Sequence, residues 1–227
     1  MEKEQVVYDF HTHTFHSDGV LSPVELIRRA AVNGYRVIGI ADHVGLGNLE
    51  SVLRQVIRDC QLCESHWNIR ALPGAELTHV PAAAIAEAAR YAKDLGARFV
   101  VVHGETIAEP VEPGTNLAAV RCPDVDILAH PGLITLEEAQ LAVRNGKFLE
   151  LSARKGHCLT NGHVLKMGRQ AGARFLVDSD SHEPGDLLTD AFARKVAIGA
   201  GLEEEELGDV LERNPQALLA RLASAMA

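Results

Sequence analysis

The feature that most constrains the fold of this chain is an alternation of short apolar segments with helical segments. Seven apolar runs, most of them rich in β-branched residues, predict strands at residues 6–10, 36–41, 71–77, 97–102, 125–129, 147–151 and 173–177. Segments of helical character lie between most of these runs. Repeated strand–helix units predict a parallel sheet with helices packed outside it, either as a closed barrel or as an open doubly wound sheet.

Helix boundary signals support this alternation. Capping boxes are predicted at residues 22–25 and 135–138, and Asn214-Pro215 predicts the start of a C-terminal helix. Glycines follow four of the helical segments, where a left-handed residue ends a helix, at positions 34, 96, 146 and 172. No glycine-rich phosphate loop follows the first strand, and this favours the barrel over the doubly wound sheet.

Length and composition predict one barrel domain over residues 1–227, because no linker or composition shift divides the chain. The N-terminal segment MEKEQ is polar and acidic, and the apolar runs are too short to span a bilayer, so we expect a cytoplasmic protein with no membrane partner. The net charge of −9, from 31 acidic and 22 basic residues, gives no indication of a nucleic-acid groove. Bound cations are expected to offset part of this acidity.

Candidate metal ligands lie at the carboxyl ends of six of the seven predicted strands: His11 and His13, Asp42 and His43, Glu76, His103, His130, and finally Asp178, Asp180 and His182. The carboxyl ends of parallel strands meet at one rim of a barrel. Alternation along a strand also directs both rings of an HxH pair to one face, within reach of one ion. Buried together without cations, these groups would repel one another or lack partners. The pattern therefore predicts a metal centre at the C-terminal rim of the strands.

Five segments resemble motifs of the PHP (polymerase and histidinol phosphatase) family. The run "DFHTHTFHSDGVLSPVELIRRAAVNGYRVIGIADH" resembles the first two motifs, "GAEL" the bridging glutamate, "VVHGE" and "AHPG" the middle histidines, and "DSDSH" the last motif. The similarity spans residues 8–182. It implies an α/β fold, a distorted (β/α)7 TIM-like barrel with a trinuclear metal centre, and the seven predicted strands agree with this expectation.

The resemblance also implies which residues bind each ion. One ion is assigned to His11, His13, Glu76 and Asp180; a second to Glu76, His103 and His130; and a third to His43, His182 and a ligand from the first loop. The family places either a histidine or, in its SDG version, an aspartate in that loop, and this chain offers both His16 and Asp18. The SDG spelling favours Asp18. We expect Glu76, Asp180 and His182 to be catalytic as well as ligands.

Mixed imidazole and carboxylate ligands suit two or three divalent ions of zinc, manganese or iron, and the sequence does not choose among them. A water bridging two such ions loses a proton near neutral pH, and the resulting hydroxide is placed to attack phosphorus. Arg154 and Lys155 follow the sixth strand in "ELSARKGH" and are predicted to bind the substrate phosphate. Arg121, His157 and His163 are weaker candidates for that role. His66 and His79 have no motif support.

Supporting roles are predicted for two further acids, because Asp42 and Asp178 lie beside the expected ligands. Asp42 is expected to orient a ligand histidine. Asp178 is expected either to orient a ligand or to cap its strand end.

The predicted function is that of a metal-dependent phosphoesterase that hydrolyses a small phosphomonoester, with histidinol phosphate as the named candidate. Two alternatives stay open: an amidohydrolase-like metal hydrolase of amide or ester bonds, and a PHP nuclease or structural module. Amidohydrolases usually take a bridging lysine or glutamate from the fourth strand, whereas this chain has His103 there and its carboxylate on the third. Every ligand position is filled, which favours an active enzyme over a structural module. The substrate, the metal and the oligomeric state are left open.

Overall fold

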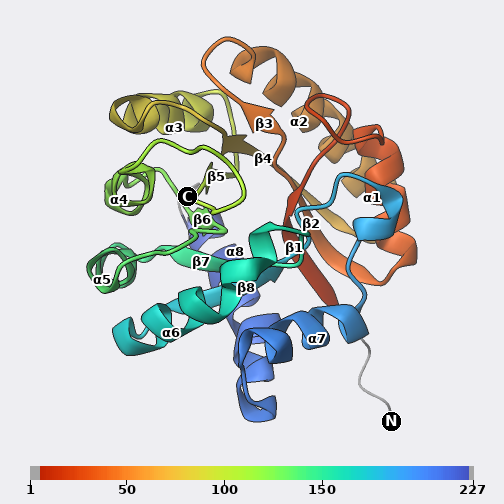
Figure 1. Ribbon diagram of the computed structural model, residues 1–227. Helices are drawn as coiled ribbons and strands as arrows, with labels where there is room; N and C mark the ends of the chain where they lie inside the picture. The colour runs from red at the N-terminus through yellow and green to blue at the C-terminus, as the bar shows by residue number, and fades with distance from the viewer. Residues whose placement is uncertain (1–5, 225–227) are drawn as a thin grey trace.

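The computed structural model describes residues 6–224, with strands at the centre and helices around them (Figure 1). Its eight parallel strands are β1 (Val7–Thr12), β2 (Tyr35–Ile40), β3 (His43–Val44), β4 (Arg70–Leu77), β5 (Phe99–His103), β6 (Ile127–Ala129), β7 (Phe148–Ser152) and β8 (Arg174–Asp178). The described α-helices are α1 (Pro23–Val32), α2 (Leu49–His66), α3 (Ile85–Asp94), α4 (Thr115–Arg121), α5 (Leu136–Arg144), α6 (Asn161–Ala171), α7 (Asp190–Ala200) and α8 (Asn214–Ser224).

The strands pair in the order β1-β2-β4-β5-β6-β7-β8 and form a nearly closed barrel of seven parallel strands. All seven predicted strands and the predicted (β/α)7 TIM-like class are confirmed. The two-residue strand β3 was not predicted. It prolongs β2, because β2 pairs with residues 70–73 of β4 and β3 pairs with residues 76–77 of the same strand. This pairing places His43 directly beside Glu76.

Most of the predicted helix boundaries are present. Thr135 forms the full capping box with Glu138 at the start of α5. At α1, the Ser22 side chain accepts a hydrogen bond from the Glu25 amide, but the Glu25 carboxylate pairs with Arg29 instead of completing a box. The four glycines predicted to end helices all have positive φ: Gly34, Gly96, Gly146 and Gly172.

The interior of the barrel is filled by large apolar side chains. Phe10 and Phe99 meet edge to face with their ring centroids 6.2 Å apart. Gly74 on β4 leaves the space that the Phe99 ring occupies, because a Cβ atom there would overlap the ring. Leu218 and Leu222 of α8 join the same buried cluster and close the N-terminal end of the barrel. This packed N-terminal end, the floor of the barrel, supports the ligands predicted at the opposite rim.

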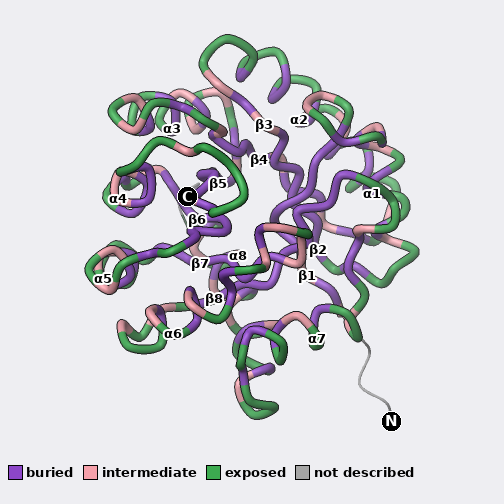
Figure 2. The backbone as a smooth tube through the Cα atoms, viewed as in Figure 1, coloured by how far each residue is buried: buried purple, intermediate pink, exposed green. Residues whose placement is uncertain are grey.

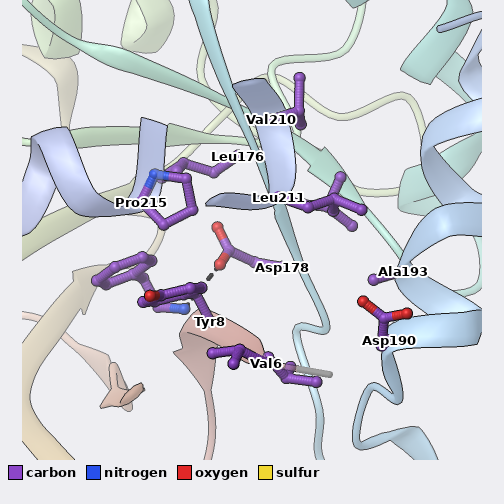
Figure 3. A pocket seen from close by; sticks show the side chains of 12 residues that line it. Val6, Tyr8, Leu176, Asp178, Asp190, Ala193, Val210, Leu211 and Pro215 are labelled. Carbon is purple, nitrogen blue, oxygen red and sulfur yellow. Dashed lines mark hydrogen bonds between the residues drawn. The ribbon is translucent and has the colours of Figure 1, made fainter. Parts of the chain in front are cut away.

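The barrel is joined differently between β1 and β8, where side chains replace part of the backbone ladder. Asp178 accepts a hydrogen bond from the Phe10 amide at 2.7 Å, and Asp9 accepts one from the Ser179 amide at 3.1 Å. Asp178 lines a small cavity of about 10 Å³, together with Tyr8 and other residues (Figure 3). A cavity of this size has room for about one water molecule. Asp178 thus joins two strands across the seam, which is closer to the predicted capping role.

Buried residues concentrate on the central strands and the inward faces of the helices, and exposed residues face outward (Figure 2). Burial of apolar helix faces against the strands is the main stabilising contribution in such a layered fold. Among residues 6–224, no helix has both the length and the apolar character needed to cross a membrane.

Candidate metal centre

The nine predicted ligands all lie at the C-terminal rim of the barrel. His11 lies near the end of β1 and His13 directly follows that strand. His43 lies in β3, Glu76 in β4 and His103 at the end of β5. His130 directly follows β6, Asp180 and His182 lie two and four residues after β8, and Asp18 lies in the loop before α1. Seven of the nine are buried. His43 is partly exposed, and the Asp18 side chain is 54% exposed. Strand ends thus deliver most of the ligands, and one loop residue faces the solvent side.

The first group surrounds His11 and His13. Their ring nitrogens and an Asp180 oxygen lie within 4.8 Å of one another. His11 Nε2 is 3.2 Å from Glu76 Oε1, and His13 Nε2 is 3.2 Å from Asp180 Oδ1. Two donor atoms about 2.1 Å from one ion, about 90–110° apart, are separated by roughly 3.0–3.4 Å. The observed spacings therefore fit ligands that share an ion.

The second group lies at the solvent side and contains Asp18. Asp18 Oδ1 is 3.0 Å from His182 Nε2 and 3.5 Å from His43 Nε2, and His13 completes this group. Partial burial would raise the pKa of Asp18, but His182 and His43, when protonated, would donate hydrogen bonds to it and hold this pKa well below its usual range. His16 belongs to none of the candidate metal groups in the described chain, and its ring contacts Phe15.

The third group differs from the predicted set. His103 and His130 gather with His157, whereas Glu76 groups with His11 and His130 and not with His103. The shared binding of one ion by Glu76 and His103 therefore stays a prediction. His157, ranked low as a phosphate contact, is buried, and its ring stacks on His130 with the centroids 4.1 Å apart.

Two residues near His103 were missed by the sequence reasoning. Glu109 lies in the loop before α4, with Oε2 3.3 Å from His103 Nε2 and 3.3 Å from His79 Nε2. His79 was assigned no role from sequence, yet it belongs to a candidate metal group with these two residues. No motif marks either residue in the sequence, although His79 follows the end of β4 by two residues, as Asp180 follows β8.

The histidine rings are held so that one nitrogen faces the centre. His182 Nδ1 lies 3.0 Å from the Asp180 carbonyl oxygen, and His103 Nδ1 lies 3.2 Å from that of Gly104. A carbonyl oxygen only accepts, so Nδ1 must carry the proton and the Nε2 of each neutral ring presents a lone pair. These lone pairs face carboxylates, an arrangement that is repulsive unless a cation lies between them. The donor set therefore fits metal ions.

Buried carboxylates position further rings. Glu150 of β7 lies with Oε2 2.6 Å from His11 Nδ1, a contact that the sequence reasoning missed. In the sequence, Glu150 stands out as an acidic residue inside an otherwise apolar strand. Asp42 was predicted to orient a ligand histidine, and this is wrong: its carboxylate accepts hydrogen bonds from the Thr14 amide and hydroxyl and from the Ser17 hydroxyl, each at 2.7 Å. Asp42 instead holds the loop that carries Asp18.

Strained backbone also marks this rim. Three non-glycine residues in the described chain have a φ in the left-handed region: His79 at 51°, His130 at 26° and Asp180 at 52°. Such conformations cost free energy and persist where the surrounding structure requires them, often at functional sites. Two of these three residues are predicted ligands.

Burial shifts the pKa values of several groups at the rim. Burial lowers the pKa of His103 to about 4 and that of His157 to about 2, so both rings are neutral at pH 7. Burial also raises the pKa of Asp180 to about 6, although His11 and His130 oppose this. Neutral imidazoles are the form that binds metal ions.

The predicted phosphate-binding residues line a cavity beside this centre. It has a volume of about 470 Å³, and its lining includes Arg154, Lys155, His182 and Phe192. The Arg154 side chain donates a hydrogen bond to the Asp180 carbonyl oxygen at 3.3 Å, and Lys155 is exposed. A cavity of this volume is in the range of small-molecule sites.

Two weaker candidates lie away from this cavity lining. Arg121 is the last residue of α4, which runs back from the rim. It therefore lies toward the opposite end of the barrel. His163 lies in α6 with Nε2 2.9 Å from the Ile134 carbonyl oxygen. His66 ends α2 and is exposed.

Comparison with known proteins places the chain in a family. The uncharacterized protein MJ1295 of Methanocaldococcus jannaschii is 46% identical over 216 residues, which cover 95% of this chain and 99% of that protein. The chain belongs to the MJ1295 family. No protein-family model matches the chain.

Two other sequence relatives match over smaller parts of their length. A 5'-3' exoribonuclease of Haemophilus influenzae is 42% identical over 52 residues, which are 22% of this chain and 19% of the enzyme. The DNA polymerase/3'-5' exonuclease PolX of Bacillus subtilis is 25% identical over 205 residues and matches 80% of this chain and 35% of its own length.

Solved structures share the fold at low sequence identity. An amidohydrolase superposes with a TM-score of 0.65, at 13% identity, over 96% of this chain and 74% of its own. The histidinol phosphatase candidate hisK of Listeria monocytogenes gives a TM-score of 0.57, at 13% identity, over 79% of this chain and 96% of its own. A two-domain Bacteroides vulgatus protein described as containing a PHP-like metal-dependent phosphoesterase gives 0.50, at 17% identity, over 79% and 52%. These likenesses establish the barrel fold.

Proposed function

We propose that this protein is a metal-dependent hydrolase of the PHP type and, more specifically, a phosphoesterase that acts on a small phosphomonoester. The observation that carries the specific proposal is the position of Arg154 and Lys155. Both line the cavity of about 470 Å³ that His182 also lines. An anion-binding pair beside a candidate metal centre suits a substrate whose reacting group is a phosphate.

The metal-dependent part of the proposal rests on the donor atoms at the rim. His11 Nε2, both ring nitrogens of His13 and Glu76 Oε1 are buried and have no hydrogen-bond partner among the described residues. Ions held by the nine assigned ligands would satisfy these atoms. When bound, such ions would supply Lewis acidity at the phosphoryl group and would activate water. Which ions bind, and how many, is part of the proposal.

The chain's own residues would then bind and orient the ester. Arg154 lies close enough to Asp180 for its guanidinium to face the same space, with Nε 3.9 Å from Asp180 Oδ2. Its planar donors match two phosphate oxygens at once. The exposed Phe192 ring at the cavity wall offers an apolar surface to the leaving group. Glu76 contacts His11 of the first group and His43 of the second group, so it would set the relative positions of these two groups.

The names of the two partial relatives favour phosphate over amide chemistry. Both are described as exonucleases, and nuclease activity cleaves phosphodiester bonds. This observation also supports a second candidate function, cleavage of a terminal phosphodiester. The chain's acidity and the limited cavity volume favour a small monoester over a long strand.

A substrate screen tests the proposal. Protein purified without chelator is assayed on phosphomonoesters, terminal phosphodiesters and neutral amides or esters, with manganese, zinc or iron(II) added. The expected result is highest kcat/KM on a small phosphomonoester and loss of activity after chelation. Preference for a dinucleotide would select the second candidate. Turnover of amides alone, or phosphatase activity that survives complete metal removal, would overturn the proposal.

A further inference from the structure

We infer that His157 and Glu109, which are not among the nine predicted ligands, complete the metal site that contains His103 and His130. This site would have three imidazole nitrogens and one carboxylate. It lies at the β5–β7 side of the rim, and Glu76 is not part of its group. The inference concerns the metal centre on which the proposed function rests and does not depend on which ester is cleaved.

The three histidine rings of the proposed site are buried and lie close together. His103, His130 and His157 are all buried, and one ring nitrogen of each lies within 4.8 Å of the others. His157 is fixed from behind, because its Nδ1 is 2.8 Å from the Thr106 hydroxyl. Its Nε2 therefore faces the centre, 3.9 Å from Asp180 Oδ2. A histidine that served only to fill space would not need this orientation.

The carboxylate comes from the loop over these rings. Glu109 lies in residues 104–114, which connect β5 to α4 and arc in front of the barrel in Figure 1. Its Oε2 is 3.3 Å from His103 Nε2, and its Oε1 is 3.5 Å from His157 Nε2. These separations are close to the roughly 3.0–3.4 Å expected of neighbouring ligands on one ion. One carboxylate thus spans two of the three rings.

The ring orientation argues against a simple hydrogen-bond network. His103 Nδ1 points to the Gly104 carbonyl oxygen, so the neutral ring has its proton there. Its Nε2 then presents a lone pair to the Glu109 carboxylate, which also offers only lone pairs. Two acceptors at 3.3 Å repel unless a cation lies between them. A metal ion at this point would also be reached by His130 and His157.

The ligand type indicates the metal. Three imidazoles with one carboxylate form the nitrogen-rich tetrahedral set that zinc prefers. The group around His11 and His13 contains more oxygen ligands, because Asp180 and Glu76 belong to it or touch it. We therefore expect zinc to be retained longest at the His157 site, whereas manganese or iron would exchange more readily at the other positions.

The strongest test is metal binding measured without any substrate. Zinc per chain and zinc affinity are measured, by elemental analysis and by chelator competition, for the parent and for His157→Ala, His157→Gln, Glu109→Gln and the control His163→Ala. His163 is a matched control, because it lies in α6 outside the candidate metal groups of the described chain. The expected result for both His157 variants is loss of about one zinc ion, with affinity at that site weakened at least about 100-fold, and for Glu109→Gln roughly 10-fold weakening. His163→Ala should match the parent.

A crystal of the zinc-loaded parent gives an independent readout. Anomalous scattering at the zinc edge should place an ion within about 2.0–2.2 Å of His157 Nε2 and of a Glu109 oxygen. An ion bound by other residues alone, or variants that keep every ion with parental affinity, would overturn the inference while leaving the proposed function intact. Parent protein that binds no ion would overturn both. Normal metal binding without phosphoesterase activity would overturn only the function.

Discussion

The two ends of the barrel treat buried charge in opposite ways. At the N-terminal end, Asp126 is compensated by the protein itself: it pairs with Lys93 at 2.6 Å and Arg221 at 2.8 Å and accepts the Val100 amide at 2.9 Å. At the C-terminal rim, buried histidines and carboxylates face one another, and atoms such as Glu76 Oε1 find no hydrogen-bond partner among residues 6–224.

This difference separates stability from function. Opposite charges and the α8 side chains stabilise the floor without any additional component. At the rim, the proposed metal ions would supply this compensation, and three left-handed non-glycine residues of the described chain lie there. We therefore expect substitutions at the rim to change metal content and turnover, and substitutions at the floor to change the free energy of unfolding.

Glu76→Gln should have the largest effect. Glu76 approaches His11 and His130 through one oxygen and His43 through the other, so the neutral amide weakens contacts to several groups at once. We expect metal content to fall and kcat/KM to drop by orders of magnitude. Elemental analysis and steady-state kinetics measure both quantities.

A matched control for this charge change is Glu87→Gln, at an exposed position in the first turn of α3. It should leave both quantities unchanged. Near-normal turnover of the Glu76 variant at full metal occupancy would show that the rim does not depend on this carboxylate.

Asp18→Ala should have the next largest effect. Asp18 is the exposed member of a group with His43 and His182, so its loss should release about one ion per chain. His16→Ala should release none, because His16 contacts Phe15 and joins no candidate group in the described chain. Metal analysis of both variants decides between them. The reverse pattern would make His16 the ligand of the first loop.

Much of this rim could be predicted from sequence because the strands fix it. Predicted ligands at or near the end of a strand, such as His11 and His103, inherit their position from the parallel sheet, and apolar runs locate the sheet reliably. Glu150 was also accessible in principle. It is an acid in a buried apolar strand, and alternation sends it to the same side of β7 as Phe148, into the barrel.

The remaining contacts depend on loops, and these could not be predicted. Glu109 reaches His103 only because residues 104–114 fold back over the rim, and the Thr106 contact to His157 joins two loops far apart in sequence. The contacts of Asp42 also depend on a loop, because the loop before α1 turns toward this residue and donates hydrogen bonds to its carboxylate. Local sequence patterns do not encode such tertiary contacts.

Replacement of both Arg154 and Lys155 by Ala should weaken substrate binding and leave the metals in place. A charge-assisted hydrogen bond to a phosphate oxygen contributes about 1.5–3 kcal/mol, or about 10- to 150-fold in binding. We expect KM for a phosphomonoester and the inhibition constant of inorganic phosphate to rise by that factor. The single variants should show that Arg154 contributes more, because it contacts Asp180 whereas Lys155 is exposed.

Unchanged metal content distinguishes this effect from damage to the rim, and a neutral ester, if turned over at all, should be unaffected. Phosphate inhibition equal to that of the parent would show that other groups bind the anion, and that the Arg154 and Lys155 side chains are only solvated.

Asp126→Asn should have the smallest effect on catalysis and should act on stability alone. The substitution keeps the shape of the side chain but removes the charge that Lys93 and Arg221 face at the floor. Both partners are partly exposed, so water compensates part of the loss, and we expect the free energy of unfolding to fall by roughly 1–3 kcal/mol. Urea unfolding of the chelator-treated protein measures this without a contribution from bound ions.

Glu25→Gln, which breaks an exposed pair with Arg29, is the matched control and should change stability by less than about 1 kcal/mol. Metal content and KM should stay at parental values, because Asp126 lies at the amino end of β6 and the candidate ligands lie at the carboxyl ends. Loss of metal in Asp126→Asn would show that the two ends are coupled through the barrel, and that the division between a self-compensated floor and a cation-dependent rim does not hold.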